Sequence, residues 1–141
     1  MHVLIATDAD WVLAEVRSAL EGAGTTFTVC RNGRDVTAAV LAHEPDVAVL
    51  DLQIGSMGGM AVTMSLRLDE SSVRLPHVPV VMLLDRVADV HLARRSGAEA
   101  WLVKPLDPIR LRRAVTAASA GELYHEGVPS RPRDGEPAPT G

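Results

Sequence analysis

Short apolar runs alternate with segments of helical periodicity along the first 120 residues of the chain. The runs rich in β-branched and large aliphatic residues predict five strands, at residues 3–6, 27–30, 47–50, 78–84 and 100–103. Two of these runs are apolar almost throughout. This is the pattern of a strand that helices cover on both faces of a parallel sheet.

Apolar residues at three- and four-residue spacing predict a helix after each strand. The first helix has Asp10 as its expected N-cap, and the fifth has Asp107 as its N-cap and Pro108 as its first residue. The regular alternation predicts an α/β fold with a doubly wound, five-stranded parallel sheet. Right-handed crossovers and short connections favour the flavodoxin-like strand order 2-1-3-4-5, with helices on both faces.

The periodicity ends near residue 120, and residues 121–141 are rich in proline and glycine. We therefore expect one domain over residues 1–120 and a disordered tail over 121–141, in which at most Leu123 and Tyr124 dock locally. The chain has 141 residues and 47% hydrophobic content, which fits a single globular domain.

Charge and cysteine content argue against several classes of protein. The formal net charge is -4 and no recognition helix is predicted after residue 120, so we do not expect nucleic acid as a partner. No apolar run approaches the length of a membrane span. Cys30 is the single cysteine and no leader-like segment follows Met1, so a cytoplasmic location is expected.

Charged residues follow four of the predicted strands. Asp8 follows the first strand, Asp51 the third, Asp85 the fourth and Lys104 the fifth; Lys104 is the single lysine among 14 basic residues. In a doubly wound sheet, ligands bind at the carboxyl ends of the strands where the strand order reverses. Asp8 and Asp51 are therefore expected to lie close together and to suit Mg²⁺. Any one of these aspartates alone is explained more simply as a cap of a strand end or helix start.

The combination resembles the receiver domain of bacterial two-component response regulators. The resemblance covers residues 2–120 and rests on four segments: VLIATDAD, VAVLDLQIGSMGGM, VPVVMLLD and GAEAWLVKPLDP. It implies signal transduction in a phosphorelay, with a histidine kinase or another phosphodonor as partner.

The resemblance also implies a role for individual residues. Asp51 matches the aspartate that accepts the phosphoryl group, and Lys104 matches the lysine that contacts the phosphoryl oxygens. Asp8, Asp51 and the backbone carbonyl of Gln53 match the ligands of Mg²⁺. Gly59 matches the glycine that lets the loop after the third strand turn.

Four positions depart from the family pattern. Thr7 replaces an acidic residue, so Mg²⁺ affinity should fall; Leu84 replaces a serine or threonine whose hydroxyl meets the phosphoryl group. Asp85 adds bulk and negative charge where the family has a small residue, and Gly55 stands where proline is common. Thr7 and Asp85 are expected to lie next to the metal ligands. Trp101 occupies the aromatic switch position, where a bulky Leu84 would hold it in one conformation.

Three functions stay open at this point. The first is an atypical stand-alone receiver, phosphorylated on Asp51, that signals by protein contact without being an enzyme beyond its own phosphorylation and dephosphorylation. The second is a pseudo-receiver that binds a protein constitutively and independently of phosphorylation. The third is a small Mg²⁺-dependent enzyme acting on phosphate compounds. The sequence identifies no downstream target.

A basic strip is expected on the fourth and fifth helices, at Arg94, Arg95, Arg110, Arg112 and Arg113. Such residues usually form a solvated face. Because receivers often pair through this face, a homodimer across the fourth helix, fifth strand and fifth helix is the alternative.

Overall fold

The computed structural model describes residues 1–55, 57–72 and 75–125, over which strands and helices alternate. The strands are β1 (His2–Ala6), β2 (Thr26–Cys30), β3 (Val47–Asp51), β4 (Val80–Leu84), β5 (Ala100–Val103) and β6 (Tyr124–His125). The α-helices are α1 (Asp10–Leu20), α2 (Val36–His43), α3 (Gly59–Ser71), α4 (Val90–Ser96) and α5 (Pro108–Ser119). Two 3₁₀ helices, η1 (Gly33–Asp35) and η2 (Val87–Asp89), precede α2 and α4. Within these described ranges, no helix has the length and apolar character that crossing a membrane requires.

The strands form one parallel sheet in the order β2-β1-β3-β4-β5-β6. The first five strands confirm the doubly wound order expected from the sequence. The sixth is a difference: β6 pairs with the outer edge of β5, with Tyr124 opposite Ala100 and His125 opposite Trp101. Two residues are too few for a periodic signal, so the sequence predicted no strand there. The rest of the expected tail, residues 126–141, lies outside the described residues.

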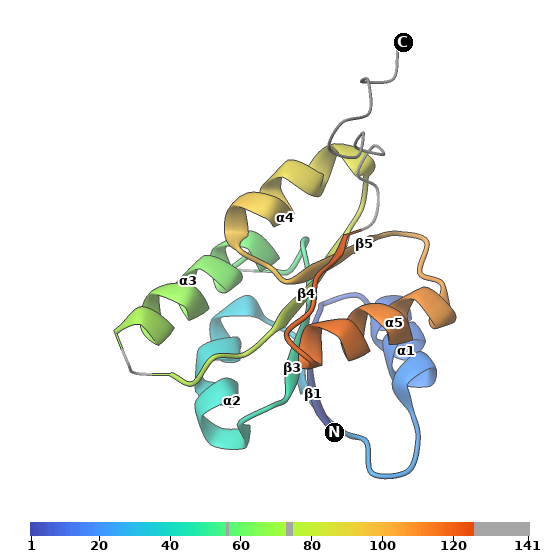
Figure 1. Ribbon diagram of the computed structural model, residues 1–141, viewed down its shortest axis with the longest axis horizontal. Helices are drawn as coiled ribbons and strands as arrows, with labels where there is room; N and C mark the ends of the chain where they lie inside the picture. The colour runs from blue at the N-terminus through green and yellow to red at the C-terminus, as the bar shows by residue number, and fades with distance from the viewer. Residues whose placement is uncertain (56, 73–74, 126–141) are drawn as a thin grey trace, which may run out of the picture.

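Helices cover both faces of the sheet. α1 and α5 lie on one face, and α2, α3 and α4 lie on the other (Figure 1). Alternate residues of β1 belong to the two cores: Val3 and Ile5 pack with α1 and α5, whereas Leu4 and Ala6 pack on the opposite side. All residues of β3 and β4 are buried, which explains why these two segments are continuously apolar in sequence.

The two predicted helix N-caps have different outcomes. Asp107 caps α5 as expected, because its carboxylate accepts hydrogen bonds from the N–H groups of Ile109 (2.9 Å) and Arg110 (3.0 Å). The prediction for Asp10 is wrong: Asp10 is the first residue of α1, and Ala9 holds the N-cap position without a side-chain cap. The carboxylate of Asp10 instead pairs with the guanidinium of Arg31 in the β2–α2 loop.

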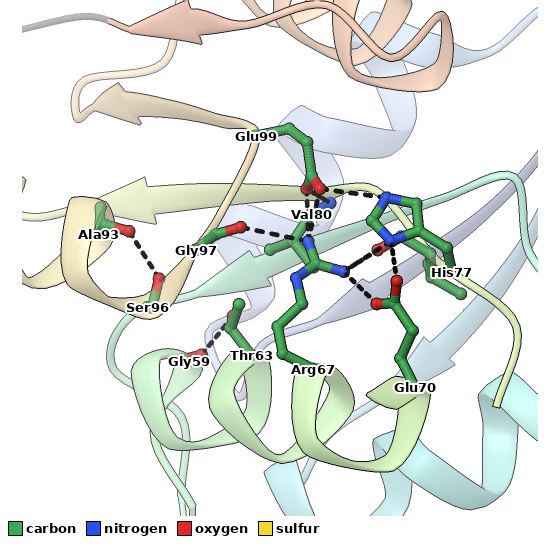
Figure 2. A network of polar contacts seen from close by, with 11 residues as sticks. Gly59, Thr63, Arg67, Glu70, His77, Val80, Ala93, Ser96, Gly97 and Glu99 are labelled. Atoms are coloured by element: carbon green, nitrogen blue, oxygen red, sulfur yellow. Dashed lines mark hydrogen bonds and ion pairs between the residues drawn. The ribbon is translucent and has the colours of Figure 1, made fainter. Parts of the chain in front are cut away.

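A polar network fastens α3 to the starts of β4 and β5 (Figure 2). Arg67 of α3 donates to both carboxylate oxygens of Glu99, at 2.7 and 2.5 Å. Glu99 also accepts from the N–H of Val80 (2.7 Å), and His77 lies between Glu99 (3.2 Å) and Glu70 (2.8 Å). Glu99 and Val80 precede or begin their strands, so this network lies at the amino-terminal edge of the sheet. The candidate site lies at the opposite edge, where the strands end.

Candidate functional site

Asp51 is the last residue of β3 and is only 1% exposed. Its Oδ2 accepts a hydrogen bond from the hydroxyl of Thr7 (2.8 Å), the residue that follows β1. Its Oδ1 accepts from the ammonium of Lys104 (2.8 Å), the residue that follows β5, and from the N–H of Gln53 (3.3 Å). The structure therefore brings together residues from three strand ends, and both oxygens of this buried carboxylate have partners.

The ammonium of Lys104 bridges two carboxylates. Its Nζ lies 2.8 Å from Oδ1 of Asp51 and 2.8 Å from Oδ1 of Asp85, the residue after β4. Burial lowers the pKa of Lys104, but the hydrogen bonds to the two carboxylates outweigh burial and raise the pKa above its usual value. The Nζ also lies 5.5 Å from the centroid of the Trp11 ring, within the range of a cation–π contact. Lys104 is therefore a fixed positive charge at neutral pH.

Asp8 lies beside the loop that follows β3. Its Oδ2 accepts from the N–H of Gly55 (2.9 Å), and its backbone carbonyl accepts from Arg31 (3.4 Å). Proline has no N–H, so glycine at position 55 allows a bond to Asp8 that the family's common proline could not make. In this structure, Asp8 therefore fastens the loop after β3 to the end of β1.

The residues expected to bind Mg²⁺ have suitable chemistry. The carboxylates of Asp8 and Asp51 and the carbonyl of Gln53 are oxygen donors, and Mg²⁺ prefers one or two carboxylates with several waters. The described part of the chain holds no group of three or more His, Cys, Asp and Glu side chains able to bind a metal ion. With only two carboxylates and one carbonyl, the donor set fits a Mg²⁺ ion that keeps several waters. Thr7 stands where the family has a further acidic residue.

Gly59 permits α3 to begin against the end of β3. A Cβ on Gly59 would lie 2.5 Å from the carbonyl oxygen of Asp51, and the Gly59 N–H donates to the carbonyl of Leu52 (3.1 Å). The glycine is needed for this close approach of two backbones. The start of α3 and the position of Asp51 are consequently linked.

Leu84 and Trp101 belong to the apolar core between the sheet and the helices α2, α3 and α4. Leu84 is 0% exposed and Trp101 is 1% exposed. His125 of β6 stacks on the Trp101 ring, with centroids 3.7 Å apart and planes at 3°. Trp101 is thus turned inward and covered. No motif or periodicity in the sequence marks His125 as part of this core.

A family model describing the response regulator receiver domain matches residues 3–116 of this chain. The chain belongs to this family. Receiver domains are signalling domains of two-component systems that generally bind Mg²⁺ at their phosphorylation site. The family expected from the motifs around Asp51 and Lys104 is therefore confirmed.

The chain is similar to curated members of two sizes. It is 32% identical over 142 residues to the transcriptional regulatory protein CseB of Streptomyces avermitilis, covering 99% of this chain and 58% of CseB. It is 29% identical over 120 residues to protein PilH of Pseudomonas aeruginosa, covering 85% of this chain and 98% of PilH. The chain thus spans little more than half of CseB and nearly all of PilH.

The fold is also similar to solved receivers. The signal receiver domain of a signal transduction histidine kinase from Syntrophus aciditrophicus superposes with a TM-score of 0.74 at 24% sequence identity. The match covers 85% of this chain and 90% of that one. At this identity the likeness shows the fold alone.

Proposed function

We propose that this receiver acts in a phosphorelay by accepting a phosphoryl group on Asp51 with the help of Mg²⁺. The observation that carries the proposal is the 2.8 Å contact between the Lys104 ammonium and Oδ1 of Asp51. A carboxylate is anionic at neutral pH, so it needs no separate base to act as a nucleophile. The adjacent ammonium supplies the positive charge that the transferred group requires.

The chemistry follows from these charges. An oxygen of Asp51 forms a bond to phosphorus, and the bond between phosphorus and the donor's leaving group breaks as that group departs with the electron pair. Lys104 neutralises negative charge on the phosphoryl oxygens. The Thr7 hydroxyl holds the other oxygen of Asp51 and so orients the carboxylate. Asp8, Asp51 and the carbonyl of Gln53 would hold Mg²⁺, which, when bound, would supply further charge neutralisation.

The second candidate is a pseudo-receiver that binds a protein partner in its unmodified state. One observation favours it: Asp51 is 1% exposed, and both its oxygens and the Lys104 ammonium have partners without a phosphoryl group. Leu84 also lacks the hydroxyl that the family uses to bind the phosphoryl group. In this role the fixed surface of the domain, rather than a change in it, would carry the information.

Two further parts of the proposal concern partners. The match along 98% of PilH supports a receiver that acts as a stand-alone domain. We further propose that it is cytoplasmic, takes its phosphoryl group from a histidine kinase or a small phosphodonor, and signals by protein contact. If a homodimer forms across α4, β5 and α5, the second copy meets β6 at the outer edge of β5.

Intact mass after incubation with acetyl phosphate and Mg²⁺ separates the two candidates. A working receiver gains one phosphoryl group in the wild type and in Asp46→Asn, a charge-matched control at an exposed position before β3, but not in Asp51→Asn. Omission of Mg²⁺ should also prevent the gain. No gain at high Mg²⁺ would favour the pseudo-receiver. A gain that persists in Asp51→Asn would place the acceptor elsewhere, with Asp85 the next carboxylate to map.

A further inference from the structure

Asp85 differs from the other groups around Lys104 because it comes from the loop after β4. Its side chain is 38% exposed, whereas those of Lys104 and Asp51 are 11% and 2% exposed. An ammonium has three N–H donors. Two of those of Lys104 are directed to Asp51 and Asp85, and the ring of Trp11 lies 5.5 Å from Nζ. Little of the ammonium is left for an incoming group.

A phosphoryl group on Asp51 needs the same ammonium. Its oxygens bring additional negative charge to a site that already holds two carboxylates around one cation. Two arginines on the loops beside the site have other partners: Arg31 pairs with the carboxylate of Asp10 and the carbonyl of Asp8, and Arg86 pairs with Asp89. The Asp85 carboxylate and the phosphoryl oxygens therefore compete for Lys104.

We propose that Asp85 is an internal competitor for Lys104: its carboxylate holds the ammonium in the unmodified protein, and the phosphoryl group on Asp51 displaces it. This inference rests on the proposed function and specifies the regulation of that site. The family relies on a hydroxyl at the position of Leu84 to respond to the phosphoryl group, and leucine has none. In this chain, the adjacent Asp85 provides the group that changes partner.

The backbone connects Asp85 directly to η2 and α4, so a change in the partner of Asp85 can alter these elements. η2 begins at Val87, two residues after Asp85, and is followed at once by α4. η2 is itself held by Asp89, whose carboxylate accepts from the backbone N–H of Arg86 (3.2 Å). Displacement of the Asp85 side chain therefore acts on the backbone that leads into η2 and α4. We therefore expect the surface formed by η2 and α4 to differ between the unmodified and the phosphorylated domain.

The first test compares initial phosphorylation rates by acetyl phosphate in the wild type, Asp85→Asn, Asp85→Ala and Asp46→Asn. Both Asp85 variants should react about fivefold faster, which corresponds to the ~1 kcal/mol of a partly exposed ion pair. Asp46→Asn makes the same change in net charge at an exposed residue before β3, at the opposite edge of the sheet, and should react at the wild-type rate because asparagine can also accept the hydrogen bond from the N–H of His2. Thermal unfolding confirms that each variant is folded.

The second test needs no phosphodonor. Lys104 is the single lysine, so acylation by an N-hydroxysuccinimide ester, followed by peptide mass mapping, reports its availability separately from that of the N-terminal amine. Acylation of Lys104 should be severalfold faster in Asp85→Asn than in the wild type and unchanged in Asp46→Asn.

The two tests separate the inference from the function on which it rests. Equal acylation rates in the wild type and Asp85→Asn would show that Asp85 does not hold Lys104, whatever the phosphorylation result. Faster acylation with equal phosphorylation rates overturns the competition. Faster acylation without a phosphoryl gain in any variant supports the hold of Asp85 on Lys104 and overturns the proposed function instead.

Discussion

Replacing Leu84 by threonine restores a hydroxyl at the end of β4 and tests whether its absence limits the site. Leu84 is 0% exposed and packs in the same core as Trp101. Truncation of a buried leucine to alanine costs about 2–5 kcal/mol. Threonine keeps one methyl group but brings a hydroxyl to a buried position, so we expect a loss of about 2 kcal/mol. In a domain of this size, that lowers Tm by about 8 °C.

The same substitution should improve the chemistry. The family resemblance implies that the hydroxyl donates to the phosphoryl group, and a hydrogen bond to a charged acceptor contributes about 1.5–3 kcal/mol. We therefore expect at least about a tenfold longer lifetime of phosphorylated Asp51, measured by intact mass after removal of the donor.

Leu83→Thr is the matched control for this experiment. Leu83 is 1% exposed and lies in the same strand, but it packs in the opposite core with α1 and α5. It should lower Tm by a similar amount without changing the lifetime. If Leu84→Thr and Leu83→Thr give the same Tm and the same lifetime, the reasoning is refuted, and Thr7 or Asp85 limits the site instead.

Three other predictions concern Gly59 at the start of α3, His125 stacked on Trp101, and Thr7, which stands where the family has an acidic residue. Gly59→Ala should cost about 1–3 kcal/mol and slow phosphorylation, because its Cβ would lie 2.5 Å from the Asp51 carbonyl oxygen. Gly22→Ala, whose Cβ would meet nothing within 4 Å, should leave Tm unchanged, and equal Tm losses would contradict the argument. Burial lowers the pKa of His125 below 6.5, so its contribution to stability is complete above pH 6.5 and lost as the pH falls. The wild type should therefore lose more Tm between pH 7.5 and 5.5 than His125→Phe, which keeps a stacked ring, and parallel losses would count against this. Thr7→Asp places a carboxylate against Oδ2 of Asp51, so Tm should fall without Mg²⁺ and rise more than in the wild type when Mg²⁺ is added; an unchanged Mg²⁺ response would rule this out.

The fold was predictable because its signals are long and redundant. The apolar runs of β3 and β4 are short and rich in valine, which favours buried parallel strands over helices, and Asp107 followed by proline marks a helix start. Local signals gave poorer results. Asp10 is as good an N-cap by type as Asp107, but its carboxylate pairs with Arg31, which the fold brings near from the end of β2.

The sequence predicted which residues gather at the site but not which of their side chains bond to one another. Strand ends at one edge of a sheet bring Asp51 and Lys104 together whatever their rotamers. The bond between Lys104 and Asp85 depends on where two side chains point, and the sequence indicated only that Asp85 adds bulk and charge. His125 was missed for a related reason: a two-residue strand reaches Trp101 only through tertiary pairing with β5.

Thr7 and Asp85 are best considered together. Compared with the family pattern, the site lacks a carboxylate beside Oδ2 of Asp51 and has an additional one beside Lys104. An acidic residue at position 7 would face Oδ2 of Asp51, where repulsion is relieved by a metal ion; the threonine hydroxyl donates a hydrogen bond there instead. Asp85 places a carboxylate on the far side of Lys104. Without a metal, both oxygens of Asp51 consequently already have partners, the Lys104 ammonium and the Thr7 hydroxyl, so phosphorylation must break an existing arrangement rather than fill an open one. On this argument, restoring the acidic residue at position 7 alone strengthens Mg²⁺ binding, but full reactivity also requires that Asp85 release Lys104.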